Sequence, residues 1–340
     1  MDRRNPYQPI TPPALPPSGN EPIEARLVRG NATESRHRVQ VLVTDASGKV
    51  HAQWGDPSFR FFPRSAIKVI QALSWVAPGY HKGFGLNGEE MSIACGSHEG
   101  EEHHVAVVAR WLEKIHLNEF SLECGAHEPY DRGAARRLAA RGGDWSQLHN
   151  NCSGKHCGFL TACLKEGWPL ASYVNYDHPV QARLRELQAP FFDLDFNRAA
   201  WGIDGCGIPT YEVTLQSMAT AMARVADPRN LGADIQQGIA ALNSSIAAHP
   251  QLIGGSETFS TKVTPETEGR VFAKVGAEGV FGLWIPGEGL GIAAKCEDGS
   301  IRGVEIAVNA VLRELGYPLS FYSPYVRRWS GEVVGEMICG

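Results

Sequence analysis

The sequence lacks the features that mark several large classes of protein. Its 340 residues contain no apolar run close to the ~18 residues that a membrane-spanning helix needs. No long basic segment points to nucleic acid, and the formal net charge is -5. The eight cysteines form no Cys-x-x-Cys pair, which excludes a zinc ribbon. We therefore expect a globular protein that binds neither nucleic acid nor membranes.

The N-terminal segment also lacks an apolar stretch, so it does not resemble a secretory signal peptide. Residues 1–20 are rich in proline, which predicts a disordered or extended tail. Without an export signal the expected location is cytoplasmic, where reducing conditions disfavour disulfide bonds. We therefore expect the cysteines to be thiols, most of them buried.

Segments with strand character gather at the two ends of the sequence, and helical patterns fill the middle. Residues 21–54 are expected to be β structure, with strands at 38–44 and 49–54 around a turn at 45–48. Further strands are expected at 269–275, 279–286 and 290–296. Amphipathic helices are expected at 66–76, 101–115, 158–165, 178–187, 213–225, 233–248 and 303–315.

This order of elements predicts the fold class. Because strands and helices do not alternate, we expect an α+β fold and not a parallel doubly wound one. An antiparallel sheet would be built from both termini, and a helical insert would pack against it. We expect residues 21–60 and 255–340 to form the sheet lobe and residues 61–254 a mainly helical lobe, together making one catalytic unit.

Ser65 and Lys68 stand at Ser-x-x-Lys spacing just after Pro63. Residues three apart share one face of a helix, so Lys68 is expected to reach back toward the Ser65 hydroxyl. A lysine accepts the proton of a serine only when it is neutral, which requires burial or a neighbouring cation. Taken alone, the spacing favours an ordinary helix start with a surface lysine, because Ser-x-x-Lys arises often by chance.

A second feature of the sequence favours the catalytic interpretation of Ser65 and Lys68. Enzymes that transfer acyl groups through Ser-x-x-Lys also carry a Lys-Thr-Gly-like triplet on a strand. Lys274 and Gly276 stand late in an expected strand, and the glycine would let a substrate approach the strand edge. Lys262 is a rival, but it lacks the glycine. The alternative is that Lys274 is an exposed hairpin lysine. The order of these elements matches that of the serine β-lactamases and penicillin-binding proteins.

Ser97 follows Gly96 and precedes a helix whose first turn is acidic. It is therefore either a catalytic hydroxyl or a helix-capping residue. His98, His103 and His104 lie nearby, but neither the H-E-x-x-H pattern nor its inverse fits the glutamates around them. This excludes a zinc-protease site.

Residues 148–158 and 202–209 are dense in glycine, cysteine and polar residues, which a plain core does not need. Cys152 and Cys206 are candidate thiolate ligands for a soft metal such as zinc, although their wide separation makes this support weak. Lysine is a rare ligand because it must first lose its proton, so chemistry alone would not nominate Lys155. Asp204 is either a turn residue or a carboxylate aimed at a substrate ammonium.

Five motifs occur in the order Arg64-Ser-Ala-Ile-Lys68, Cys95-Gly-Ser-His98, Asn151-Cys-Ser-Gly-Lys-His156, Asp204-Gly-Cys-Gly-Ile-Pro209 and Lys274-Val-Gly-Ala-Glu-Gly279. Together they resemble the asparaginase II family, the rhizobial-type or class 3 L-asparaginases. The resemblance covers residues 21–340. The third and fourth motifs are specific, whereas Ser-x-x-Lys is not.

The resemblance implies a hydrolase that converts L-asparagine into L-aspartate and ammonia. It also implies a fold similar to serine β-lactamases and glutaminases, usually as a homodimer. By motif, Ser65 would be the nucleophile and Lys68 its base. Ser97 and Lys274 would form a second serine–lysine pair that assists proton transfer.

The resemblance further implies a Zn²⁺ site close to the catalytic residues. Its ligands would be Cys152, Lys155 and Cys206. Arg64, His156 and Asp204 would hold the amino acid or orient the site. Relatives are expected to carry an acidic residue where this chain has Ser260, which leaves the role of that loop open.

Two other classes of function stay open at this point. One is another serine acyl hydrolase, such as a glutaminase, an esterase or an enzyme that acts on β-lactams. The other is a catalytically silent binding protein on the same fold. The joint presence of Ser65, Lys68, Ser97 and Lys274 argues against the second class, because a silent protein has no need of all four.

Overall fold

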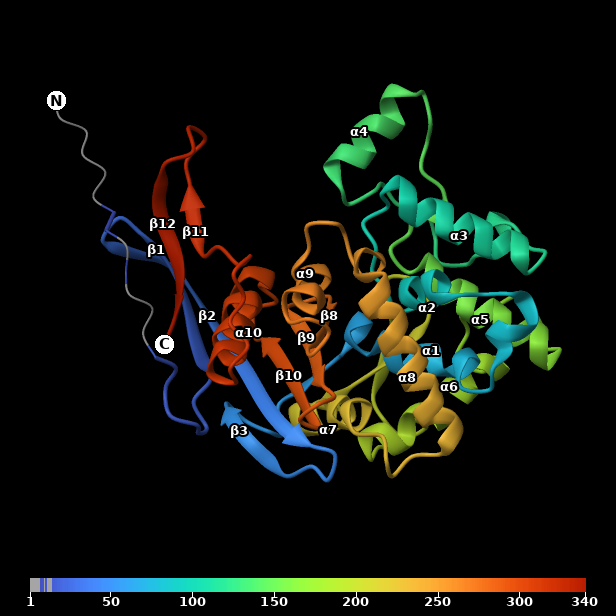
Figure 1. Cartoon of the computed structure of the whole chain (residues 1–340), viewed down its shortest axis with the longest axis horizontal. Helices are drawn as coiled ribbons and strands as arrows, with labels where there is room; N and C mark the ends of the chain where they lie inside the picture. The colour runs from blue at the N-terminus through green and yellow to red at the C-terminus, as the bar shows by residue number, and fades with distance from the viewer. Residues whose placement is uncertain (1–6, 9, 11–13) are drawn as a thin grey trace.

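The structure is a computed structural model that describes residues 7, 8, 10 and 14–340 (Figure 1). The strands are β1 (Ile23–Arg29), β2 (Ala32–Asp45), β3 (Val50–Trp54), β4 (Arg60–Phe61), β5 (Trp201–Ile203), β6 (Pro209–Tyr211), β7 (Val213–Thr214), β8 (Phe272–Gly276), β9 (Val280–Ile285), β10 (Leu290–Cys296), β11 (Tyr325–Arg327) and β12 (Val333–Cys339). The α-helices are α1 (Lys68–Val76), α2 (Gly88–Cys95), α3 (Glu102–Lys114), α4 (Arg132–Ala140), α5 (Ser153–Glu166), α6 (Pro179–Phe192), α7 (Leu215–Ala226), α8 (Ala233–Ala248), α9 (Phe259–Glu266) and α10 (Ile301–Glu314). Short 3-10 helices are η1 (Arg64–Ile67), η2 (Tyr80–Phe84), η3 (Glu119–Ser121), η4 (Gln147–His149) and η5 (Pro250–Leu252).

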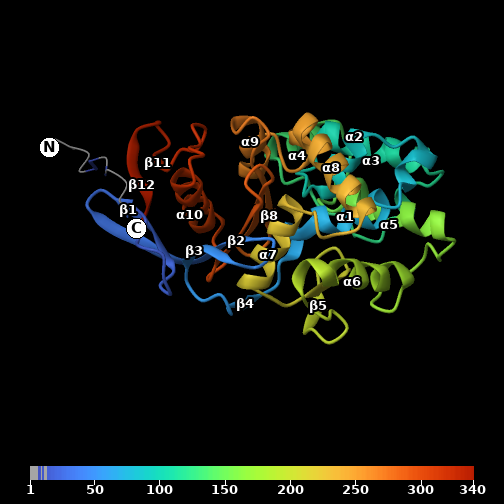
Figure 2. The same ribbon diagram turned by 60° about the horizontal axis from the view of Figure 1, so that its bottom comes forward.

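The main sheet joins the two ends of the chain. Its strand order is β11-β12-β1-β2-β10-β9-β8, with β3 paired to β2 outside that path. All of these pairs are antiparallel. The helices α1 to α8 lie to one side of this sheet, as Figures 1 and 2 show. The predicted α+β fold, with an antiparallel sheet from both termini and a helical insert, is confirmed.

Helices cover both faces of the central strands. α10 packs against β1, β2, β10 and β12, while α7 packs against β2, β9 and β10. Every residue of β9 and β10 is buried, which explains why these strands are almost continuously apolar. A Cβ at Gly291 would lie 2.0 Å from the backbone nitrogen of Ala223, so glycine is needed where α7 crosses β10.

The apolar core has two parts. One lies among the helices and includes Trp75 and Trp111, whose ring centroids are 4.9 Å apart. The other lies between the sheet and α10 and includes Phe281 and Val304. Within the described residues, no helix combines the length and apolarity needed to cross a membrane.

Several elements differ from the sequence prediction. The helix expected at 66–76 begins as η1, and only then continues as α1. The sequence analysis missed α2, α4, α9, the short strands β4 to β7, and the C-terminal strands β11 and β12. α9 carries Pro265 and several hydroxyl residues, so its sequence has little helical periodicity. β12 is stabilised by pairing with β1, from the other end of the chain, which local patterns do not report.

The proline-rich segment is described only in part. Of the predicted tail, residues 1–6, 9 and 11–13 lie outside the described residues. The described part runs along the sheet: the backbone N–H of Ile10 donates to Glu336 Oε1 at 2.6 Å, and Trp54 Nε1 donates to the Pro16 carbonyl at 2.8 Å. These contacts give the described residues an ordered, extended course.

Candidate active site

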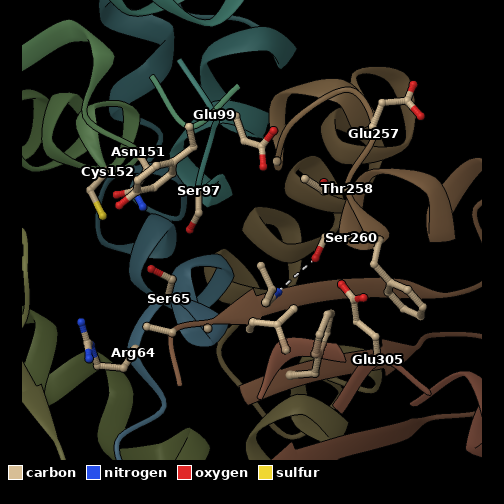
Figure 3. A pocket seen from close by; sticks show the side chains of 18 of the residues that line it. Arg64, Ser65, Ser97, Glu99, Asn151, Cys152, Glu257, Thr258, Ser260 and Glu305 are labelled. Carbon is tan, nitrogen blue, oxygen red and sulfur yellow. Dashed lines mark hydrogen bonds between the residues drawn. The ribbon is translucent and has the colours of Figure 1, made fainter. Parts of the chain in front are cut away.

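A cavity of about 670 Å³ opens between the helical insert and the sheet (Figure 3). η1 supplies Arg64 and Ser65 to its wall, and the turn after α2 supplies Ser97. β8 and α9 close the opposite side with Val275 and Ser260. Residues from four distant parts of the sequence therefore meet in one pocket.

Ser65 sits in the first turn of η1 with its hydroxyl in the cavity wall. Among the described residues the hydroxyl has no hydrogen-bond partner, so it is free to meet a substrate. Its backbone N–H belongs to the first turn of the helix, where N–H groups lack an intrahelical acceptor. Arg64 before it has φ of 50°, a conformation that a non-glycine residue adopts only when its surroundings hold it there.

Arg64 is held by Asp204, across the cavity mouth. Arg64 Nε and Nη2 lie 2.8 and 2.7 Å from Asp204 Oδ1. Burial raises the pKa of Asp204, but the neighbouring Lys155 and Arg64 outweigh it and lower the pKa overall. Asp204 is therefore a carboxylate that is already paired, which fixes η1 to the turn that carries Cys206.

Ser97 lies between two buried lysines. Its Oγ is 3.0 Å from Lys68 Nζ and 2.9 Å from Lys274 Nζ. Lys68 also donates to the carbonyls of Gly96 and Asn151, and Lys274 donates to the carbonyl of Val275. The structure thus brings the predicted Ser97–Lys274 pair together. It places the Lys68 amine against Ser97, without a hydrogen bond to Ser65.

The two lysines have no carboxylate partner in this cluster. Burial lowers the pKa of Lys68. Burial lowers the pKa of Lys274 well below its ordinary value, and charge repulsion from the nearby Lys68 lowers it further. Carbonyl oxygens accept hydrogen bonds but carry no full charge, so they do not restore the ammonium form. Burial and the repulsion between the two side chains therefore favour the neutral amine, the form that can take a proton from a hydroxyl.

Lys155 lies in a second cluster, with two thiols. Lys155 Nζ donates to Cys206 Sγ at 3.1 Å. A hydrogen bond from Cys152 lowers the pKa of Cys206 to about 5, and the same contact raises the pKa of Cys152 to about 12. Burial lowers the pKa of Lys155, but the two thiols and Asp204 outweigh it and raise the pKa overall. The predicted zinc ligands therefore lie together as a thiolate, a thiol and an ammonium.

His156 is placed away from the cavity wall. It is fully buried in α5, and its Nδ1 lies 2.8 Å from the Tyr173 hydroxyl. Burial lowers the pKa of His156 to about 3, so the ring is neutral. Its Nε2 has no hydrogen-bond partner among the described residues. The structure does not bring the predicted substrate-binding histidine into the lining of the pocket.

Two residues that line the cavity were missed as site residues by the sequence analysis. Ser260 Oγ accepts a hydrogen bond from the Val275 backbone N–H at 3.1 Å and so fixes the edge of β8. The Glu99 side chain points into the cavity and has no hydrogen bond or ion pair with any described residue (Figure 3). In the sequence, the position of Glu99 two residues after Ser97 was the one feature that could have marked it as a site residue.

Gly276 lines the cavity and also has a packing role that the sequence analysis did not predict. A Cβ at this position would lie 2.6 Å from the Pro63 carbonyl oxygen and 3.2 Å from the Ala66 nitrogen. The glycine therefore lets η1 pack directly on the strand edge. This contact brings Ser65 beside β8, the last strand of the sheet, which carries Lys274.

All eight cysteines are free and buried, as expected. Two other groups of possible metal ligands lie among the described residues, one of His37, Cys296 and Asp298 and one of Glu101, His103 and His104. In the second group both ring nitrogens of His104 already have partners, the Glu101 N–H and the Gln251 carbonyl.

Comparison with known proteins places the chain in a family. A sequence model described as L-asparaginase II matches residues 25–339. No curated protein sequence matches the chain significantly.

Solved structures resemble the fold at low identity. Mglu in its native form with NaCl is 14% identical, with a TM-score of 0.46 over 83% of this chain and 61% of that chain. Mglu in its glutamate form is 13% identical, with a TM-score of 0.47 over 84% and 63%. A β-lactamase from Mycobacterium bovis is 13% identical, with a TM-score of 0.39 over 81% and 94%. The chain thus spans about three fifths of the length of the Mglu structures. Similarity of this degree carries no argument about activity.

Proposed function

The chain belongs to the L-asparaginase II family, and from that membership we propose that it hydrolyses the side-chain amide of L-asparagine to L-aspartate and ammonia. The observation that carries the proposal is the position of Ser97 Oγ, 3.0 and 2.9 Å from the amines of two buried lysines in the cavity that also holds Ser65. Amide hydrolysis needs a nucleophile, a base, an acid for the leaving nitrogen and donors for the oxyanion.

Ser65 is the proposed nucleophile, because its hydroxyl is free and faces the cavity. Its proton passes to Lys68, which follows it by one helical turn, either directly or through the Ser97 hydroxyl that Lys68 contacts. The Ser65 oxygen bonds to the amide carbon and forms an acyl-enzyme as the carbon–nitrogen bond breaks. The proton that Lys68 has accepted passes through the Ser97 hydroxyl, which Lys274 also contacts, to the departing nitrogen, which leaves as ammonia. Water then hydrolyses the ester and releases L-aspartate.

The oxyanion requires two N–H donors. Ser65 supplies one from the first turn of η1, where the N–H lacks a helical acceptor. The backbone N–H of Val275 already donates to Ser260 Oγ, so it is not available to the oxyanion. Ala277 follows two residues later on the same edge and lines the cavity, and we assign the second donor to its N–H.

The charged ends of the amino acid need partners as well. Arg64 uses Nε and Nη2 for Asp204, which leaves Nη1 for the α-carboxylate of the substrate. We assign the α-ammonium to Glu99, because this carboxyl has no partner and Asp204 is already paired. Burial and the neighbouring Glu101 raise the pKa of Glu99, and a bound ammonium would reverse that shift.

We also propose that Cys152, Lys155 and Cys206 hold Zn²⁺. The donor set fits, since Cys206 is a thiolate in contact with Lys155 Nζ at 3.1 Å and Cys152 hydrogen-bonds to it. Binding requires Lys155 to lose its proton, which its raised pKa opposes, and the ion's charge must compensate. When bound, the ion would add positive charge beside the substrate site. Elemental analysis of protein purified without chelator tests this, and less than ~0.1 zinc per chain contradicts it.

The homodimer and the cytoplasmic location implied at the outset remain proposals. Light scattering behind a sizing column tests the first: a mass of one chain, with 37.0 kDa, contradicts it. Fractionation of cells that express the full chain tests the second, and recovery outside the cytoplasm contradicts it.

The function itself is tested by ammonia release from L-asparagine and L-glutamine, measured side by side. The two substrates differ by one methylene, which changes pocket fit by roughly 1–3 kcal/mol. We expect release from L-asparagine to exceed that from L-glutamine at least tenfold. A reversed preference would favour a glutaminase, and no release from either would favour esters, β-lactams or a silent binding protein.

A further inference from the structure

One part of the cavity lining, called the aromatic compartment below, consists of clustered aromatic rings. Phe259 is at the centre of the cluster, and the rings of Phe281, Phe321 and Tyr322 meet it edge-on at centroid distances of 5.4, 5.5 and 5.8 Å. All four residues line the same cavity as Ser65 and Ser97. A cavity of about 670 Å³ holds far more than one small amino acid, because volumes of roughly 300–1,000 Å³ take drug-sized ligands.

One carboxyl group faces this compartment. Glu305 lies in the first turns of α10, and Figure 3 shows its side chain directed toward the cavity below Ser260. Among the described residues it has no hydrogen-bond or ion-pair partner. Burial raises the pKa of Glu305 to about 7, which is the behaviour of a carboxyl that lacks a cation.

The lysine and arginine side chains that line the cavity are paired with other carboxylates. Arg64 pairs with Asp204 at 2.7 Å, and Lys262 pairs with Glu257 at 2.6 Å. Lys262 Nζ lies 6.0 Å from the centroid of Phe321, at the edge of the compartment. A carboxyl without a cation, beside several aromatic rings, is the arrangement that binds an ammonium group, because the ring faces and the carboxylate both attract positive charge.

We propose that this aromatic compartment with Glu305 is a second subsite that binds an ammonium group on the leaving-group side of the substrate. The substrate class would be asparagines whose amide nitrogen carries a short aminoalkyl chain, in addition to L-asparagine itself. The inference rests on the proposed function, since the same serine cleaves the amide. Phe259, Phe321 and Tyr322 would enclose the alkyl chain, and Glu305 would pair with its terminal ammonium.

The reaction on such a substrate balances without any further reagent. The Ser65 oxygen bonds to the side-chain carbonyl carbon, and the carbon–nitrogen bond breaks. Through the Ser97 hydroxyl the nitrogen takes the proton that Lys68 accepted from Ser65, and it leaves as a diamine. Water hydrolyses the remaining ester, so the products are L-aspartate and the diamine.

The test compares two ligands that differ only at the end of the chain. N4-(4-aminobutyl)-L-asparagine ends in an ammonium, whereas N4-pentyl-L-asparagine ends in a methyl group of similar size. Calorimetric titration of Ser65→Ala protein measures both affinities without turnover. We expect the ammonium ligand to bind about tenfold more tightly than the pentyl ligand.

Variants in the same Ser65→Ala background locate the effect. Glu305→Gln keeps the size of the side chain and is expected to reduce the tenfold ratio to about one. Glu257→Gln is the matched control, because this carboxyl lies on the cavity rim but is already paired with Lys262. Phe321→Leu gives a second variant, and loss of one ring is expected to reduce the ratio about threefold.

Equal affinities of the two ligands, or a tenfold ratio that survives in Glu305→Gln, would overturn the second subsite. A ratio that also disappears in Glu257→Gln would overturn it too, because the preference would then reflect the general charge of the cavity. Failure of the proposed function has a separate signature: the unmodified protein would release no ammonia from L-asparagine, whatever the ratio of the two affinities.

Discussion

Three lysines are buried in this site, and their surroundings push their pKa values in opposite directions. Lys68 and Lys274 are surrounded by carbonyls and the Ser97 hydroxyl, and their pKa values are lowered. Lys155 is just as buried, but it faces the thiolate of Cys206 and the carboxylate of Asp204, and its pKa is raised. Burial alone therefore does not decide whether a lysine is an amine or an ammonium. The charge of its neighbours decides.

From this difference we propose different tasks for the two clusters. The serine–lysine cluster holds amines that can move protons, so it suits acyl transfer. The thiol–lysine cluster holds fixed charges that anchor Asp204 and suit a soft cation. Asp204 connects the two clusters. It pairs with Arg64 next to Ser65, and the positive charge of Lys155 lowers its pKa.

The largest expected effect comes from removing an amine of the first cluster. Lys274→Met keeps the length of the side chain without a proton acceptor, and we expect kcat/KM for L-asparagine to fall by about 100- to 10,000-fold. Lys262→Met is the control, since Lys262 lies on the rim of the same cavity and is expected to keep near-normal activity. If kcat/KM fell equally in the two variants, the buried amine of Lys274 would matter no more than a lysine on the cavity rim, which would contradict its role in proton transfer.

The pH dependence of activity probes the lowered pKa values directly. The reaction needs a neutral lysine, so kcat/KM rises with pH until the lysine has lost its proton. Because the folded pKa of Lys68 is lowered, the midpoint of this rise should fall below the ~10.4 of a free lysine. Below the midpoint each pH unit should lower kcat/KM about tenfold. A midpoint at or above the free value would contradict the assignment of an amine.

The second cluster is tested by thiol chemistry. In chelator-treated protein at pH 7, Cys206 with a pKa of about 5 is a thiolate, whereas Cys152 with a pKa of about 12 is not. Both line the cavity, so iodoacetamide should alkylate Cys206 at least tenfold faster, as measured by peptide mass mapping. Lys155→Met should slow the reaction of Cys206. Faster alkylation of Cys152 would reverse the assigned charges.

The smallest effect concerns the backbone contact that supports the first cluster. Gly276→Ala would place a Cβ 2.6 Å from the Pro63 carbonyl, so we expect the free energy of unfolding to fall by about 1–3 kcal/mol. At Gly287 a Cβ would meet nothing within 4 Å, and Gly287→Ala is expected to change little. Denaturant unfolding of both variants checks this. A stability of Gly276→Ala equal to that of Gly287→Ala would mean that η1 does not depend on this contact.

The sequence predicted the fold class because the elements at its two ends have clear β patterns, and β10 was predicted with its observed bounds. β12 was missed because its pairing with β1 is a long-range contact. The motifs pointed to Ser65, Lys68, Ser97 and Lys274, but not to the contact of Lys68 with Ser97. Glu99 and Glu305 were missed because an unpaired carboxyl is recognised only when its surroundings are known.

The assignment of roles to the two serines is the central claim, and trapping the acyl-enzyme tests it most directly. The protein is quenched with acid during turnover of L-asparagine, digested and mapped by mass spectrometry. We expect an aspartyl group on the peptide that contains Ser65, and none on this peptide in Ser65→Ala protein. An aspartyl group on the peptide that contains Ser97 would contradict it, and would make Ser97, between Lys68 and Lys274, the nucleophile.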